Sequence, residues 1–504
     1  MKSFCLFVTL SVFISSLFFC CTKNDSGKEL AKVITFVATD ITAFDAMAGG
    51  EVISQGTHEV TERGICWGTS PKPTINDDKT VDGSGVGVYK SRITGLIPGF
   101  TYFARAYAIS RAGIAYGEEI TFGWGNELLD LKPGTLEAVI TSQGMKNVVY
   151  LKLGGEIDQR DFRYMVRMFY SGLTEIDLYN VTIAAYEEYP EGEIPADAFS
   201  ILLKGVEIKD YLPNYYLRKF VFPKNITSVG DNAFRNCYNW EGPLVIPESV
   251  ISIGNSAFIN CIGLAGDLNI PHNVTSIGDY AFSNCSGLKG SLTIGGNVET
   301  IGNHAFSYCI GFTGSLYIGD SVLSIGDSAF NYCKSFNGSL YIGDGVTAIG
   351  DNTFQNCGGF SGTLTIGKNV MVIGDEAFSN CYKFTGPLVI PEGVTTIGFS
   401  AFYYCRDFSG PLTIPDNVTT IRNGAFYSCL NISGSLIIPE NVAYIGVQAF
   451  EDCRNITDIK VSRMHPITYS PNMFPEGLTV YVPSVAMIAY ETASGWNAHT
   501  IRGY

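Results

Sequence analysis

The chain has 504 residues, too many for one compact core, so its length favours several domains or an elongated array whose core grows along the chain. Its 56 glycines are spread along the sequence rather than gathered in a linker, which indicates one turn glycine recurring in many similar units. The formal net charge of −15 gives a surface that repels phosphate backbones, so we expect no nucleic acid among its partners.

The first residues have the pattern of an export signal. Lys2 precedes an apolar run over 4–19, which ends at Cys20 and Cys21 and is followed by a polar stretch. This pattern predicts a signal peptide over residues 1–20 and a polar tether over 21–30. The two cysteines make the segment resemble a bacterial lipoprotein signal, in which the first mature cysteine is acylated.

That resemblance makes Cys21 the expected lipidation site, with Cys20 as the alternative. It implies an exported protein attached to the membrane by an N-terminal lipid anchor, on the outer membrane and exposed at the cell surface. Cleavage as an ordinary secretory signal is a second alternative, and an uncleaved anchor is a third, although the apolar run is short for spanning a bilayer.

Residues 31–123 contain six or seven short strand-like runs separated by turn residues, without helical periodicity. This pattern predicts an immunoglobulin-like β-sandwich. The segment GLIPGFTYFARAY over 95–107 resembles the fibronectin type III pattern, in which a Leu-x-Pro-Gly turn precedes a strand. The resemblance implies that Tyr102 hydrogen-bonds back across the corner, and we expect Trp67 to be a core aromatic. Cys66 has no partner cysteine in this domain and is expected to be a buried free thiol.

From residue 217 to 460 the sequence repeats every 24 residues. A typical unit ends at Cys333 and contains a Leu-x-Ile strand, a Val-x-x-Ile-Gly turn and a short Ala-Phe-x-x-Cys segment. A unit of this size cannot bury its own apolar side chains, so neighbouring units must stack and share one core. We call each stacked unit a rung; Phe330 and Cys333 are expected to contact their equivalents in the adjacent rungs. Ten cysteines carry the period: Cys237, Cys261, Cys285, Cys309, Cys333, Cys357, Cys381, Cys405, Cys429 and Cys453.

Two further positions recur in the unit. Glycine follows the isoleucine except where Arg422 replaces it, and it fits a backbone turn that a side chain would obstruct, so we expect a distorted rung at Arg422. Aspartate or asparagine usually follows, as at Asp327, where the side chain is expected to cap a short helical turn. A carboxylate column also raises the possibility of calcium, but asparagines alternate with the aspartates, so no metal is expected.

The arrangement of the cysteines favours a buried structural role over metal binding or disulfide formation. One thiol per unit at a fixed place gives a ladder of equivalent side chains rather than a convergent ligand set or a disulfide pair. We therefore expect Cys333 and its equivalents to act as small buried hydrophobic residues, and we expect no cofactor.

The unit Val-x-x-Ile-Gly-x-x-Ala-Phe-x-x-Cys, in ten consecutive copies, resembles the BspA-type leucine-rich repeat of bacterial surface proteins. The chain is then expected to be mainly β and multidomain, with an immunoglobulin-like sandwich followed by a leucine-rich-repeat solenoid of parallel strands and short helical turns. Residues 124–216 are predicted to form its irregular N-terminal repeats and cap, with a helix within DQRDFRYMVRMF, and residues 461–504 its C-terminal cap.

Outward-facing tyrosines are the candidate ligand-binding residues. The middle residue of each Leu-x-Ile strand points outward, which places Tyr317 and Tyr341 on adjacent rungs. They form either an aromatic platform for a ligand or a packing contact between rungs. Tyr308, Tyr332 and Tyr404, each just before a cysteine, form a second candidate patch.

We expect no catalytic residues and no enzyme. The five histidines lie in different segments, and no HExxH, Walker, GxSxG or paired-carboxylate spacing accompanies them. The resemblance to BspA-type repeats implies adhesion, through the solenoid, to proteins of the host or of other bacteria. The alternative is an accessory protein that captures glycans at the cell surface through exposed aromatics such as Tyr317 and Tyr341.

Overall fold

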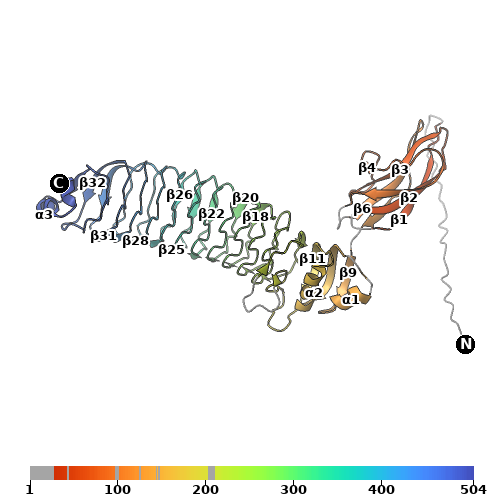
Figure 1. Ribbon diagram of the computed structural model, residues 1–504, viewed down its shortest axis with the longest axis horizontal. Coiled ribbons are helices and arrows are strands. Elements are labelled where there is room, and N and C mark those ends of the chain that lie inside the picture. The colour runs from red at the N-terminus through yellow and green to blue at the C-terminus, as the bar shows by residue number, and fades with distance from the viewer. Residues whose placement is uncertain are drawn as a thin grey trace. The chain divides into compact units, whose positions relative to one another are not determined.

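The computed structural model describes residues 28–41, 45–96, 101–123, 126–142, 145, 148–202 and 211–504. The chain divides into two compact units, Met1–Trp124 and Gly125–Tyr504, each with its own hydrophobic core (Figure 1). The predicted signal peptide, Cys20 and Cys21 lie outside the described residues. Within the described part of the chain, no helix is long and apolar enough to cross a membrane.

The first unit is a sandwich of antiparallel sheets, as predicted. Side chains along its strands alternate between the core and solvent, as in β5, where Tyr89 and Ile93 are buried and Lys90 is exposed. One sheet has the order β1 (Lys32–Thr39), β2 (Asp45–Ser54), β5 (Gly87–Thr94). The other has the order β4 (Asp78–Lys79), β3 (Val60–Gly68), β6 (Thr101–Ser110), β7 (Gly113–Tyr116), with β8 (Ile120–Gly123) also paired to β6.

The aromatic residues singled out in this unit are buried. Trp67 lies in the core, and Tyr102 stacks on Phe122 with ring centroids 5.8 Å apart. The turn over residues 97–100, on which the predicted corner contact of Tyr102 depends, lies outside the described residues. Cys66 is also buried, and this burial raises the pKa of its thiol to about 11.

The second unit begins with a cap in which two helices pack with a four-stranded parallel sheet. The predicted helix is α2 (Gln159–Phe169), and it begins with a capping box between Asp158 and Asp161, in which the Asp161 side chain accepts from the Asp158 backbone N–H at 3.0 Å. A second helix, α1 (Leu136–Ser142), precedes it. The sheet has the order β15 (Lys219–Val221), β11 (Glu175–Ile183), β10 (Tyr150–Ile157), β9 (Asn126–Leu131), and the hairpin β13 (Ile201–Leu202) with β14 (Tyr211–Leu212) lies nearby in sequence.

The solenoid that follows is held by one parallel sheet of eleven two-residue strands, stacked coil on coil (Figure 1). Its register repeats the sequence period, with Ser252 opposite Ser276 and Ile253 opposite Ile277. The strands are β12 (Glu193–Ile194), β16 (Ser228–Val229), β17 (Ser252–Ile253), β19 (Ser276–Ile277), β21 (Thr300–Ile301), β23 (Ser324–Ile325), β25 (Ala348–Ile349), β27 (Val372–Ile373), β28 (Thr396–Ile397), β29 (Thr420–Ile421) and β31 (Tyr444–Ile445).

This sheet corrects one sequence expectation, because its strands lie in the segment predicted to be a turn. The Leu-x-Ile segments, predicted to be the strands, form only short sheets. Proline explains the interruption after β26: Pro387 and Pro411 stand directly before Leu-x-Ile and lack the backbone N–H that a ladder needs, and those rungs keep only isolated bridges. The short sheets are β18 (Gly266–Asn269) with β20 (Leu288–Thr293), and β22 (Leu316–Ile318), β24 (Leu340–Ile342) and β26 (Leu364–Thr365).

The solenoid core is a set of columns of equivalent side chains, as the repeat predicts. Phe234 stacks on Phe258 with ring centroids 5.3 Å apart and an interplanar angle of 3°, and similar contacts continue through Phe450 to Phe474. A second column runs from Phe312 to Phe408. Ring stacking at this distance is compatible with the roughly 4.8 Å spacing of parallel strands.

Both ends of the phenylalanine column are covered. At the start, Phe199 stacks on Phe234 and also contacts Phe162 of α2. At the end, Trp496 packs against Phe474, and its Nε1–H donates a hydrogen bond to the Ile467 carbonyl at 2.8 Å. The C-terminal cap contains the parallel sheet β30 (Ser433–Ile438), β32 (Asn455–Val461), β33 (Thr479–Val482), β34 (Thr500–Gly503) and the short helices η1 (Ser484–Ala486), α3 (Met487–Thr492) and η2 (Trp496–Ala498).

Candidate binding surfaces

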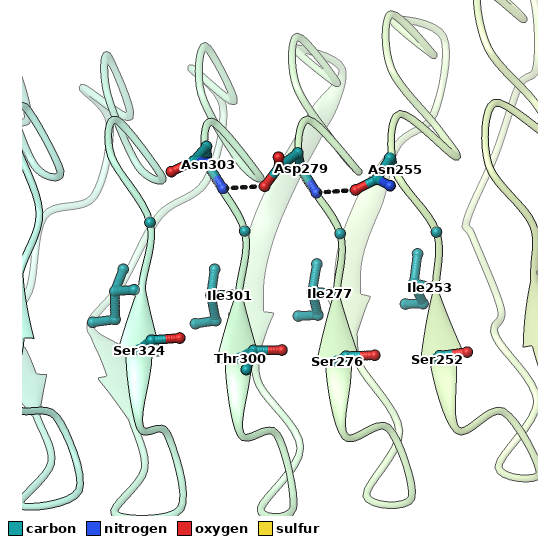
Figure 2. Close-up of a pocket in the computed structure, with 15 residues that line it drawn as sticks. Ser252, Ile253, Asn255, Ser276, Ile277, Asp279, Thr300, Ile301, Asn303 and Ser324 are labelled. Carbon is teal, nitrogen blue, oxygen red and sulfur yellow. Dashed lines mark hydrogen bonds between the residues drawn. The ribbon is translucent and has the colours of Figure 1, made fainter.

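A polar groove of about 550 Å³ lies along the eleven-stranded sheet. Figure 2 shows Ser252, Ser276 and Thr300 in one row on successive rungs, and Asn255, Asp279 and Asn303 in a second row. Its walls repeat the same small side chains from rung to rung, and no acid or base stands out from its neighbours. The groove therefore offers an extended surface rather than a reaction centre.

The second row is a hydrogen-bonded ladder, and it corrects the capping role predicted for these residues. The Asn255 side-chain oxygen accepts from the Asp279 backbone N–H at 2.8 Å, and Asp279 accepts from Asn303 in the same way at 2.7 Å (Figure 2). Each Asp or Asn thus joins its rung to the next one instead of capping a helical turn in its own rung. The Ala-Phe segments are tight turns that donate backbone hydrogen bonds to the following rung, such as Phe306 N–H to the Ala329 carbonyl.

The ladder also explains the glycine column. A Cβ placed on Gly302 would lie 2.5 Å from the Asp279 backbone nitrogen and 2.6 Å from its Oδ1. The glycine is required by close approach to the preceding rung, since its φ is not in the left-handed region.

The rung of Arg422 is not distorted, contrary to expectation. Its strand keeps the repeat register, with Ile421 opposite Ile397 and Ile445. The preceding rung carries Phe399 where most rungs have Asp or Asn, which removes the Oδ contact but keeps the backbone nitrogen that a Cβ in the glycine column would approach. The Arg422 guanidinium pairs with Asp375, Nη1 to Oδ1, at 2.6 Å.

The predicted tyrosines form two stacked pairs and one separate site. Tyr317 and Tyr341 lie with ring centroids 4.6 Å apart and an interplanar angle of 6°, and Tyr308 and Tyr332 lie 4.8 Å apart at the same angle. In each pair one face of each ring is covered by its neighbour, so much of the aromatic surface is used for contact between rungs. Tyr404 lies three rungs beyond Tyr332 and joins neither pair.

Tyr308, Tyr332 and Tyr404 share a strained backbone position. Their φ angles are 60°, 60° and 59°. Asparagine, which tolerates this left-handed conformation, occupies the equivalent position at Asn236, Asn260, Asn284, Asn356 and Asn380. A tyrosine here costs of order 1 kcal/mol of strain, and the sequence retains it three times.

Sequence reasoning named only Tyr404 of a third group, which we call the aromatic cluster: Phe399, Tyr403, Tyr404 and Tyr427. Tyr403 lies 4.5 Å from Tyr404 and 5.1 Å from Tyr427, measured between ring centroids. Phe399, Tyr403 and Tyr427 line one groove of about 520 Å³. Burial raises the pKa of Tyr403 and of Tyr427, so both phenols remain neutral donors at physiological pH.

The aromatic cluster lies in rungs whose side chains differ from those at the equivalent positions of other rungs. Phe399 and Val447 stand in the Asp/Asn column, and both line the groove. The Phe399 backbone N–H donates to Asp375 Oδ1 at 2.7 Å, but Phe399 has no side-chain oxygen to accept from the next rung, so the ladder stops there. Tyr403 and Tyr427 occupy a column that holds serine at Ser283, Ser307 and Ser379. Comparing the columns of the repeat with one another is the signal that finds this group.

The cysteine column is buried and hydrogen-bonded. The Cys333 thiol donates to the Phe306 carbonyl of the preceding rung at 3.1 Å, and the same contact recurs from Cys261 to Cys453. Burial raises the pKa of Cys309 and of Cys357 to about 12, so these thiols are protonated and unreactive. Within the described residues, no group of three or more His, Cys, Asp or Glu is placed to hold a metal ion.

Parallel coils that share one core and present long exposed faces define a leucine-rich-repeat solenoid, a class built for binding over extended surfaces. The family of the BspA type leucine rich repeat region matches residues 207–337, 265–385 and 385–476. These matches span more than half of the chain, and the chain belongs to this family.

Among solved structures, the chain is similar to a leucine-rich repeat protein of T. pallidum. The identity is 24%, the match covers 34% of this chain and 74% of that chain, and the TM-score is 0.26. No curated protein matches the chain.

Proposed function

We propose that this protein is a cell-surface adhesion protein whose solenoid binds a protein partner of the host or of other bacteria through the aromatic cluster. Membership of a repeat family that commonly mediates protein binding supports the general role. The aromatic cluster carries the specific proposal, because it places Phe399, Tyr403 and Tyr427 along one groove, in columns that the other rungs fill mainly with polar residues.

The composition of the cluster fits a protein partner. Protein interfaces concentrate their binding energy in a few tyrosine, tryptophan and arginine residues surrounded by weaker contacts. Arg406 lies over the Tyr404 ring at 4.5 Å from its centroid. The solenoid face around the cluster is long enough to supply the weaker contacts, since eleven rungs of about 4.8 Å extend roughly 50 Å.

The N-terminal part of the chain completes the proposal. Export as a lipoprotein acylated at Cys21 would anchor the chain on the outer membrane. The N-terminal sandwich, for which we propose a fibronectin type III-like identity, would serve as a spacer between that anchor and the solenoid. A globomycin-sensitive shift in electrophoretic mobility, lost in Cys21→Ser but kept in Cys20→Ser, tests the anchor.

A panel of immobilised matrix proteins and a glycan array, probed with residues 21–504 carrying Cys21→Ser, tests the binding role. Tyr403→Ser with Tyr427→Ser returns both positions to the residue of other rungs and should keep the fold. We expect this variant to bind its protein partner at least about tenfold more weakly, as loss of interface hot spots does.

The matched control is Tyr317→Thr with Tyr341→Thr, which also restores a residue found in other rungs, Thr293 and Thr365. It should leave protein binding unchanged. Unchanged binding by the Tyr403 and Tyr427 variant would overturn the proposed site. Binding to glycans alone, lost in the Tyr317 and Tyr341 variant, would establish the glycan-capture alternative instead.

A further inference from the structure

The N-terminal cap contains a second groove, separate from the aromatic cluster. We call it the cap groove; it has a volume of about 810 Å³ and is lined by residues of α2 and by residues 134, 137, 170, 189, 196–198 and 200. This volume lies within the range of small-ligand sites, roughly 300–1,000 Å³. The lining side chains used below are Gln159, Arg163, Tyr164, Arg167, Tyr170 and Tyr189.

Gln159 leaves a buried polar atom unsatisfied in this groove. The residue is only 5% exposed, and its Oε1 has no hydrogen-bond partner among the described residues. A buried acceptor without a donor costs about 1–3 kcal/mol. The first turn of α2 could carry an apolar residue here at no such cost, so Gln159 is best explained by a donor that arrives with a ligand.

The charged groups of the cap groove leave one cation uncommitted. Arg160 pairs with Asp158 at 2.5 Å, and Arg167 pairs with Glu137 at 2.7 Å. Arg163 is exposed on the same helix face and forms no ion pair or hydrogen bond within the described residues. Its guanidinium therefore retains its full set of donors for a carboxylate.

The carboxylates that line the cap groove are already engaged. Glu137 is paired with Arg167, and Asp161 accepts from the backbone N–H groups of Gly134, Leu136 and Asp158 at 2.7, 2.9 and 3.0 Å. Asp197 also has an interaction partner. The unmet hydrogen-bonding capacity is thus one guanidinium that requires an anion and one amide oxygen that requires a donor.

Three tyrosines complete the lining. Tyr170 is 64% exposed, and Tyr164 and Tyr189 are partly exposed. Aromatic rings pack against the apolar C–H face of a sugar, while sugar hydroxyl groups are donors of the kind that Gln159 lacks. A sugar ring that also bears a carboxylate meets all three requirements.

We propose that the cap groove binds an acidic glycan made of uronic acid residues, with the carboxylate on Arg163, a hydroxyl donating to Gln159 Oε1, and the ring against the tyrosines. This site is independent of the aromatic cluster and of the protein partner proposed for it. The two proposals can therefore fail separately.

Calorimetric titration of residues 21–504 carrying Cys21→Ser tests the site with three probes: a galacturonic acid tetrasaccharide, its methyl ester, and a blocked tetraglutamate peptide. We expect the acid to bind, and the ester to bind at least about tenfold more weakly because it lacks the charge. No binding of the acid would overturn the proposal. Equal or tighter binding of the peptide would overturn the assignment to a glycan.

Two variants locate the site. Arg163→Gln should weaken binding of the acid about tenfold or more, whereas Arg111→Gln, which removes the same charge from an exposed position in the first unit, should not. Gln159→Met keeps the volume and removes the unsatisfied oxygen, so it should raise the melting temperature of the free protein while weakening binding. Binding unchanged in both Arg163→Gln and Gln159→Met would overturn the proposal.

Discussion

At the scale of single residues, the cysteine column is more than an apolar filler. From Cys261 to Cys453, each thiol fills a buried position and also donates to a phenylalanine carbonyl of the preceding rung, as Cys333 does to Phe306 at 3.1 Å. That carbonyl also accepts from the Cys309 backbone N–H of its own rung at 3.1 Å, so the thiol uses its second lone pair. Cysteine combines small volume, apolar character and a weak donor, which explains why it occupies this position in all ten regular repeats.

Replacing Cys333 separates these two roles. Cys333→Ala leaves a small cavity and removes the donor to Phe306, so we expect the free energy of unfolding to fall by about 1–2 kcal/mol. Cys333→Ser keeps a donor and should cost less than alanine. Urea denaturation followed by circular dichroism measures both. A serine variant less stable than the alanine variant would show that the thiol acts only by apolar packing.

The buried thiols also predict alkaline instability. Burial raises the pKa of Cys309 to about 12 in the folded chain, whereas a thiol in the unfolded chain titrates near 8.5. The folded state therefore binds more protons above that lower value, and its stability is complete below pH about 8.5 and is lost as pH rises toward 12. Between these two pKa values, each such thiol lowers the free energy of unfolding by up to about 1.4 kcal/mol per pH unit.

Urea midpoints measured at pH 8 and pH 10.5, with reductant present, test this dependence. The midpoint should fall steeply with pH, and the fall should be smaller in a chain carrying both Cys309→Ala and Cys357→Ala. A midpoint that is independent of pH would contradict burial of the thiols.

At the scale of elements, each rung is joined to the next through backbone contacts that allow no side chain at the glycine column. The Asp/Asn ladder and the glycine column depend on each other, because the ladder brings Asp279 within 2.6 Å of the place where a Gly302 Cβ would lie. Where the ladder residue is Phe399, the side-chain oxygen is absent and the chain carries Arg422 in the glycine column.

Alanine substitutions at two glycines test this contact. Gly302→Ala sets a Cβ 2.5 Å from a backbone nitrogen, so we expect a loss of about 2–3 kcal/mol in unfolding free energy. Gly314→Ala is the control: its φ of 80° strains an alanine, but nothing lies within 4 Å, so the cost should be about 1 kcal/mol. A control variant as unstable as Gly302→Ala would contradict the role given to close approach.

The sequence predicts those elements that repeat and misses those that depend on one rung. The phenylalanine and cysteine columns follow from the 24-residue period, since only stacking buries them. The strands were predicted in Leu-x-Ile rather than in the following Val-x-x-Ile segment. This difference was missed because strand pairing depends on which backbone N–H groups are available, and Pro387 and Pro411 lack theirs. Phe399 and Tyr403 were missed because their departure from other rungs shows only when the columns of the repeat are compared with one another. The unsatisfied oxygen of Gln159 could not be predicted, because finding it requires coordinates.

At the scale of the whole molecule, the second unit is one hydrophobic core extended along a line and closed at both ends. α2 brings Phe162 against the first phenylalanine of the column, and Trp496 covers the last. Equivalent rungs make stability a sum over neighbours, so a whole rung can be removed without exposing the core. Removal of part of a rung shifts every later column out of register.

Paired internal deletions test the shared core most directly. Deleting residues 334–357 removes one complete rung, and we expect a folded chain with cooperative unfolding and a slightly smaller denaturant m-value. Deleting residues 334–345 removes half a rung, sets Phe and Cys columns against unrelated positions, and should leave a chain that aggregates or lacks cooperative unfolding. Equal stability of the two deletions would contradict the stacking of equivalent residues on which this structure depends.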